Sequence, residues 1–133
     1  MRTRPALTGS DCHKMMAACK AEAQKNKWNV TIAIVDDSGA ALLVERMDGA
    51  GPISAEVAMG KARTSAATRR PTKFWEDRVK EKPAFVTFPS GGVLFQGGLP
   101  IMHQGECVGA IGVSGVQSHE DEQVGQAGIT ALG

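Results

Sequence analysis

The last third of the chain combines many glycines with side chains that could do chemistry. The stretch from Gln96 to Gly115 reads QGGLPIMHQGECVGAIGVSG. A dinucleotide-binding fingerprint needs Gly-x-Gly-x-x-Gly where a strand turns into a helix, whereas Gly109, Gly112 and Gly115 are three residues apart inside a predicted strand. A phosphate-binding loop of the Walker A type needs a Gly-Lys-Ser/Thr ending, which the stretch lacks. Neither nucleotide motif is therefore present.

The same stretch contains one serine that could be a nucleophile. A nucleophile elbow has the pattern Gly-x-Ser-x-Gly, and Ser114 follows Gly112, but Val116 stands where the second glycine belongs. Glycines at near-alternate positions of a strand leave a bare patch on a sheet, where a helix, another subunit or a flat ligand can approach the backbone. We interpret these glycines first as packing positions, a role that does not exclude ligand contact.

Two glycines ahead of a proline mark the front edge of this stretch. Gly97 and Gly98 precede Leu99-Pro100, which predicts an unusual backbone turn with exposed amides. Such amides can form a small nest for an anion. Gly97, Gly98 and Pro100 are therefore candidate ligand contacts.

Three charged residues from the middle of the chain could act with that edge. Arg46 lies where a predicted strand leaves the sheet, and Lys61 is flanked by Gly60 and Ala62 on a predicted helix. A lysine and an arginine near free amides favour a ligand with a carboxylate. Glu56, if buried beside them, could act as a general base. Without burial, all three would be ordinary solvated charges.

The histidines and cysteines show no metal-binding pattern. His13, His103 and His119 are scattered without ligand spacing, so we predict no metal site. His13 points off the buried stripe of its helix and is either a plain surface residue or an axial ligand for a cofactor lying on the helix. His103 lies near a hairpin tip, where we expect it to be solvated. Cys19 and Cys107 have the character of small core residues.

Composition and charge exclude several classes of function. The 133 residues contain 42% hydrophobic and 22% charged side chains and carry a net charge of +1. This profile is typical of one globular domain, 1–133, and offers no basic footprint for nucleic acid. No apolar run approaches the length of a membrane span, and no secretory signal is evident. Three cysteines fit a reducing compartment, so we expect a cytoplasmic protein.

Hydrophobic periodicity and turn signals predict the order helix, β-hairpin, helix, β-hairpin, helix. Thr8 and Asp11 have the spacing of a helix-capping box, and the first helix then runs to about Asn26. The predicted elements are strands 29–37 and 41–47, helices 53–70 and 72–81, an irregular passage or short strand 83–92, strands 98–103 and 106–115, and a last helix 119–133 capped by Ser118 with Asp121 three residues on. Hairpins imply antiparallel pairing, so the fold class is α+β.

Several segments together resemble the GlcG/HbpS family, the haem-degrading-domain proteins related to the C-terminal domain of PduO. The resemblance rests on TIAIVDDSGAALLVERMDGAGPISAEVAMGKARTSAATRRPT, GGLPIM and GECVGAIGVSG, and covers nearly the whole chain. It implies a profilin-like fold: an antiparallel five-stranded sheet between helices, in α/β/α layers. It also implies homo-oligomers, from dimers to octamers.

The resemblance leaves two functions open. Some members of the family bind or degrade haem, and the candidate ligand here is His13. Others accompany catabolic pathways, which implies binding, and conversion, of a small organic acid or carbonyl metabolite. For that function Lys61 and Arg46 would hold the acid, the Gly97 and Gly98 amides would stabilise negative charge, and Glu56 would move a proton. The missing secretion signal favours this second, cytoplasmic role, with haem as the alternative ligand.

Overall fold

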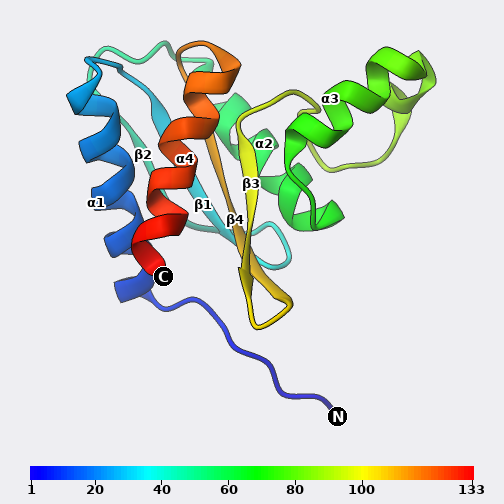
Figure 1. The fold of residues 1–133 in the computed structure, drawn as a ribbon, viewed down its shortest axis with the longest axis horizontal. Coiled ribbons are helices and arrows are strands. Elements are labelled where there is room, and N and C mark those ends of the chain that lie inside the picture. The colour runs from blue at the N-terminus through cyan, green and yellow to red at the C-terminus, as the bar shows by residue number, and fades with distance from the viewer.

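The computed structural model describes residues 1–133 and has the predicted α+β architecture. The helices are α1 (Gly9–Lys25), α2 (Ser54–Thr68), α3 (Thr72–Glu81) and α4 (Ser118–Leu132), with a short 3-10 helix η1 (Pro83–Thr87). The strands are β1 (Thr31–Asp36), β2 (Ala41–Arg46), β3 (Gly98–His103) and β4 (Glu106–Ser114). Helices α1 and α4 cover one face of the sheet and α2 the other (Figure 1).

All strands pair antiparallel in one sheet of order β2-β1-β4-β3. The two predicted hairpins are therefore confirmed, and β1 and β4 form the centre of the sheet. The expectation of five strands is wrong, because the sheet has four. Residues 83–92, the remaining strand candidate, contain Pro83, Pro89 and two glycines, and the first half of this segment forms η1 instead.

The main core lies between the sheet and the pair α1 and α4. It contains Met15, Met16 and Cys19 from α1, as predicted, together with Ile111 and Val113 from β4. The predicted capping box at the start of α1 is confirmed: Thr8 Oγ1 accepts from the Asp11 amide, and Asp11 accepts from the Thr8 amide. The cap of α4 is one residue earlier than predicted, because Gln117 pairs with Glu120.

On the other face, α2 contacts the sheet through small side chains. Ala58, Ala62 and Ala66 are fully buried and pack on Ala33 and Ala110. Gly112 lies directly beneath them: a Cβ there would lie 2.0 Å from the Ala58 carbonyl oxygen. The glycines of β4 therefore include a packing position, where the α2 backbone comes too close for any side chain.

Helix α3 and η1 form an arm beside this layered body (Figure 1). Inside the arm, the Trp75 ring stacks on Phe88 at 4.8 Å between centroids and packs on Phe74 and Phe85. Trp75 Nε1 is buried without a hydrogen-bond partner, and Val86 on η1 is 66% exposed.

None of the helices has the length and hydropathy of a membrane span.

The contact between α2 and β4 predicts an unusually intolerant glycine. We expect Gly112→Ala to lower the free energy of unfolding by about 1–3 kcal/mol, because the new methyl group meets backbone atoms rather than a movable side chain. Chemical denaturation monitored by circular dichroism would measure it.

Gly9→Ala is the matched control, since nothing lies within 4 Å of a Cβ at that position in the first turn of α1. It should leave stability unchanged or raise it by up to about 1 kcal/mol. Equal effects of the two substitutions would contradict the proposed close packing.

Candidate functional site

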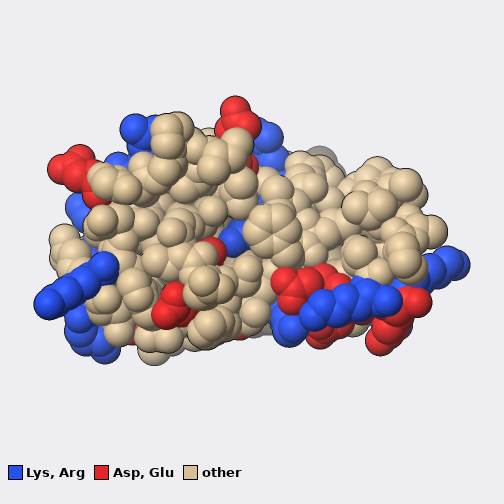
Figure 2. All heavy atoms as spheres, turned by 90° about the horizontal axis from the view of Figure 1, so that it is seen from above, with Lys and Arg blue, Asp and Glu red and all other residues tan.

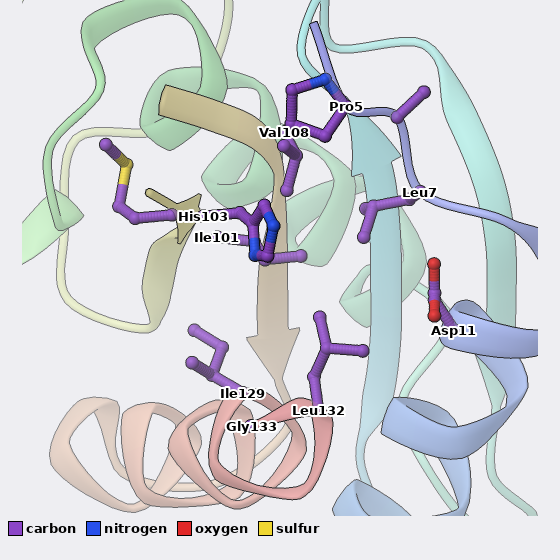
Figure 3. A pocket seen from close by; sticks show the side chains of 11 residues that line it. Pro5, Leu7, Asp11, Ile101, His103, Val108, Ile129, Leu132 and Gly133 are labelled. Carbon is purple, nitrogen blue, oxygen red and sulfur yellow. The ribbon is translucent and has the colours of Figure 1, made fainter. Parts of the chain in front are cut away.

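A cavity of about 280 Å³ opens between the N-terminal segment, the β3–β4 hairpin and the end of α4. Its walls are mainly apolar, and Figure 3 shows them facing one another across the opening. The apolar side chains that line it include Leu7, Ile101, Val108, Ile129 and Leu132. A mainly apolar hollow with few polar groups is the usual form of a small-molecule site.

The cavity has one imidazole. The ring of His103 lies over Ile101 and projects into the opening, between Val108 on one side and Ile129 on the other (Figure 3). Strand β3 explains this direction, because Ile101 and His103 are two residues apart and so point to the same face of the sheet. His103 is exposed, as expected, but it lines a cavity rather than standing alone in solvent.

A carboxylate lies at the rim of the same cavity. Asp11 Oδ2 accepts a hydrogen bond from the Thr8 amide, and the Asp11 amide donates to Thr8 Oγ1 in the capping box. Hydrogen bonding with Thr8 holds the pKa of Asp11 below its ordinary value, and the positive charge of Lys14 acts in the same direction. The site therefore combines apolar walls, one imidazole and one ionised carboxylate.

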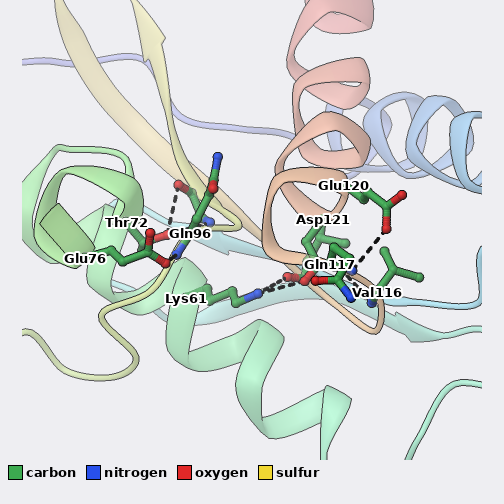
Figure 4. A network of polar contacts seen from close by, with 10 residues as sticks. Lys61, Thr72, Glu76, Gln96, Val116, Gln117, Glu120 and Asp121 are labelled. Atoms are coloured by element: carbon green, nitrogen blue, oxygen red, sulfur yellow. Dashed lines mark hydrogen bonds and ion pairs between the residues drawn. The ribbon is translucent and has the colours of Figure 1, made fainter.

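A second polar cluster lies at the opposite end of the sheet, where α2, β4 and α4 meet (Figure 4). Lys61 is 1% exposed, and its ammonium donates to Asp121 Oδ2 at 3.0 Å and to the Val113 carbonyl at 2.8 Å. Asp121 Oδ1 accepts from the Val116 amide. The Phe95 ring lies 5.0 Å from Lys61 Nζ. The pair thus joins α2 to the first turn of α4.

Burial and ion pairing shift the pKa of each of these two groups in opposite directions. Desolvation lowers the pKa of Lys61 below its ordinary value, and the charge of Asp121 partly opposes that shift. Desolvation likewise raises the pKa of Asp121, against the effect of Lys61. Both shifts show that the protein interior disfavours each charge by itself. The two groups are therefore tolerated as a pair rather than singly.

The two glycines expected to offer free amides pack beside this pair. A Cβ at Gly97 would lie 2.5 Å from Lys61 Nζ, so glycine is needed where the ammonium passes. The Gly98 amide donates to Thr72 Oγ1 at 2.8 Å, and both glycines are buried. The prediction of exposed amides is therefore wrong for Gly98. Pro100 follows in β3 and is half-buried.

The other predicted site residues are dispersed. Arg46 and Glu56 are exposed, and neither forms a hydrogen bond or an ion pair with Lys61. His13 is exposed on α1 and does not line the cavity. Lys20, two helical turns further on, pairs with Glu45 of β2, so His13 lies on the side of α1 that faces β2. The structure brings together only Lys61, Gly97 and Gly98.

Charged side chains on the face seen from above are mixed in sign. Figure 2 shows acidic and basic groups side by side along the α3 arm and mostly uncharged surface across the middle. Along the arm, Lys73 pairs with Glu76 at 3.1 Å and with Asp77 at 3.0 Å. This face therefore has no continuous basic surface for a phosphate backbone.

Comparison with known proteins adds a family to this geometry. The family model described as "Haem degrading protein HbpS-like" matches residues 7–130. The GlcG protein of Escherichia coli K12 is 44% identical over 115 residues, which are 86% of this chain and 85% of that protein.

Two solved structures have the same fold. A double mutant of HbpS from Streptomyces reticuli superposes with a TM-score of 0.92 at 34% identity, covering 100% of this chain and 91% of that one. The PduOC–haem complex has a TM-score of 0.88 at 29% identity and covers 96% of this chain and 95% of its own.

The Lys61–Asp121 pair gives a prediction about stability. Lys61→Met or Asp121→Ala alone should each lower the free energy of unfolding by about 3–5 kcal/mol, because each leaves a buried charge without its partner. The double variant should cost less than the sum of the two. Urea denaturation of the four proteins would measure this coupling.

The exposed pair Arg78–Glu81, at 3.3 Å on α3, is the matched control. The equivalent cycle there should give a coupling below about 1 kcal/mol. A coupling at Lys61–Asp121 no larger than in the control would show that the buried pair does not hold these elements together.

Proposed function

Because the chain belongs to the HbpS-like family of haem-degrading proteins, we propose that it binds haem or a closely related tetrapyrrole at the cavity beside His103. The observation that carries this proposal is the single imidazole that projects into an apolar cavity. A neutral imidazole is a common axial ligand of haem iron, and apolar walls suit the faces of a macrocycle. The haem complex of the related PduOC supports the choice of ligand.

The residues present fit part of such a group. A cavity of about 280 Å³ is at the small end of ligand sites, so one edge of a macrocycle would enter it and the remainder would lie outside. Ile101, Val108 and Leu132 would contact that edge, and His103 would be the ligand to iron. Haem held there would supply an iron centre for redox chemistry. The contribution of this chain is to bind, orient and partly shield it.

His13 remains the alternative iron ligand that the sequence predicted. It is exposed on the side of α1 that faces β2 and does not line the cavity. An exposed imidazole can bind haem weakly, but it leaves the macrocycle in water. We therefore propose His103 as the ligand and use His13 as the comparison.

A small organic acid or carbonyl compound is less well supported. The ammonium of Lys61 already bonds to Asp121 and to the Val113 carbonyl, so an acid would have to displace a buried partner. Arg46 and Glu56 form no hydrogen bond or ion pair with this ammonium. The predicted roles of Glu56, Lys61, Arg46, Gly97, Gly98 and Pro100 in binding and catalysis, and a cytoplasmic place in a catabolic pathway, stay predictions.

Assembly into a homo-oligomer also stays a proposal. Leu42 and Val44 on the edge strand β2 are 43% and 41% exposed, and Ile53 before α2 is 66% exposed. These apolar side chains are the kind of surface that a second copy would cover.

Hemin titration followed at the Soret band tests the proposed function. We expect the wild-type protein to shift the band, and His103→Ala to weaken binding at least roughly tenfold, since an iron–imidazole bond is lost. His13→Ala and His119→Ala should bind like wild type. His119 is an exposed histidine of α4 that does not line the cavity and so serves as the neutral control.

Other outcomes would contradict parts of the proposal. A loss confined to His13→Ala would move the site to the α1 surface beside β2. No Soret shift with wild-type protein would overturn haem binding itself. A thermal melt of each variant separates a lost ligand from a lost fold.

A further inference from the structure

Three arginines line a second hollow that adjoins the cavity. This hollow measures about 220 Å³. It lies at the same end of the molecule and shares Met102 with the cavity. The residues that line it are Arg2, Arg4, Arg69, Met102, Gly105, Glu106 and Cys107. We call it the arginine hollow.

Continuous chain segments join the two hollows. Arg4 lines the arginine hollow, and Pro5, Ala6 and Leu7 line the cavity immediately after it. On the hairpin, Cys107 and Val108 are neighbours that point to opposite faces of the sheet, so the two hollows lie on either side of the hairpin and meet beside Met102. A ligand that extends from the cavity past Met102 therefore reaches the guanidinium groups of the arginine hollow.

The guanidinium groups keep unused hydrogen-bond donors. Arg4 pairs with Asp37, and Arg69 Nη1 donates to the carbonyl oxygens of Asp37, at 2.7 Å, and Ala66. No bond occupies the remaining Arg69 nitrogens, and Arg2 forms no ion pair. Because a guanidinium presents five donors in a planar fork, these groups can still receive carboxylates.

The local charge favours an anion. Glu106 is the one carboxylate that lines the arginine hollow, and it forms no ion pair. Asp37 neutralises part of the charge from outside the lining. Three guanidinium groups against these two carboxylates leave the region positive. The unpaired Glu106 repels an incoming carboxylate. Removing its charge should therefore strengthen binding of the ligand, whereas removing an arginine should weaken it.

We propose that the arginine hollow is the carboxylate subsite of the cavity, so that the chain binds amphipathic macrocycles that carry acid side chains rather than neutral ones. This inference rests on the proposed function. Arg2, Arg4 and Arg69 hold the carboxylates, while Ile101, Val108 and His103 contact the apolar body. The ligand that this chain selects is therefore a flat apolar ring system with acid groups along one edge.

The test compares hemin with its dimethyl ester, which has the same ring and iron but no free carboxylates. We expect wild type to bind hemin roughly tenfold more tightly than the ester, as two partly exposed charge pairs would provide. Raising the salt concentration should reduce this preference, because the pairs are screened. Soret titrations in one solvent mixture give both affinities.

Variants assign the preference to this surface. Arg2→Gln combined with Arg4→Gln should bring the affinity for hemin close to that for the ester and leave ester binding unchanged. Arg69→Lys, which keeps a charge but removes the fork, should lower the preference partly, with a thermal melt to check α2. Glu106→Gln should bind hemin a few-fold more tightly.

Lys25→Gln is the matched control. It removes one positive charge from a side chain that is 70% exposed at the far end of α1, roughly 21 Å along the helix from Asp11. It should bind hemin and the ester like wild type. A reduced preference for hemin in Lys25→Gln would show that net charge, and not the arginine hollow, causes the preference.

The possible results separate the two proposals. Equal affinity of wild type for hemin and its ester overturns the carboxylate subsite and leaves haem binding intact. A preference that survives the arginine substitutions places the subsite elsewhere and also overturns this inference. Binding of neither porphyrin overturns the proposed function, and the subsite with it.

Discussion

The close contact between α2 and β4 is the constraint on which the rest of the structure depends. At Gly112 the backbone of α2 touches the backbone of the sheet, and alanines fill the remainder of that layer. A layer so thin allows Lys61, which lies between Ala58 and Ala62, to reach past the sheet. Lys61 can therefore bond to the Val113 carbonyl and to Asp121 on α4, which packs on the other face. Bulkier residues at the contact would move the ammonium away from both acceptors.

As a consequence, the molecule is tightly packed at one end and leaves cavities at the other. Where α2 approaches the start of α4, a buried ion pair, a neighbouring aromatic ring and two buried glycines leave little space. At the other end the N-terminal segment, the tip of the β3–β4 hairpin and the last turn of α4 leave a cavity and a charged hollow. Tight packing at one end positions the elements whose opposite ends form the candidate site.

Local patterns in the sequence predicted most of the fold. Thr8 and Asp11 marked the start of α1, alternation and turn residues marked both hairpins, and one of the glycines of β4, Gly112, proved to be a position where a helix packs on the strand. Long-range contacts were the part that local patterns could not supply. The partner of Lys61 is 60 residues away along the chain. The imidazole of His103 lines a cavity only because α4 and the N-terminal segment supply the other walls. The alternation of Ile101 and His103 was the one local signal that pointed to this histidine.

The N-terminal segment and the C-terminus both line the cavity, since Pro5 and Leu7 form one wall and Leu132 and Gly133 another. Any polypeptide joined after Gly133 therefore leaves from the mouth of the cavity, and one joined before Met1 leaves beside the arginine hollow. An affinity tag or fusion partner at either position would compete with a ligand for the same space.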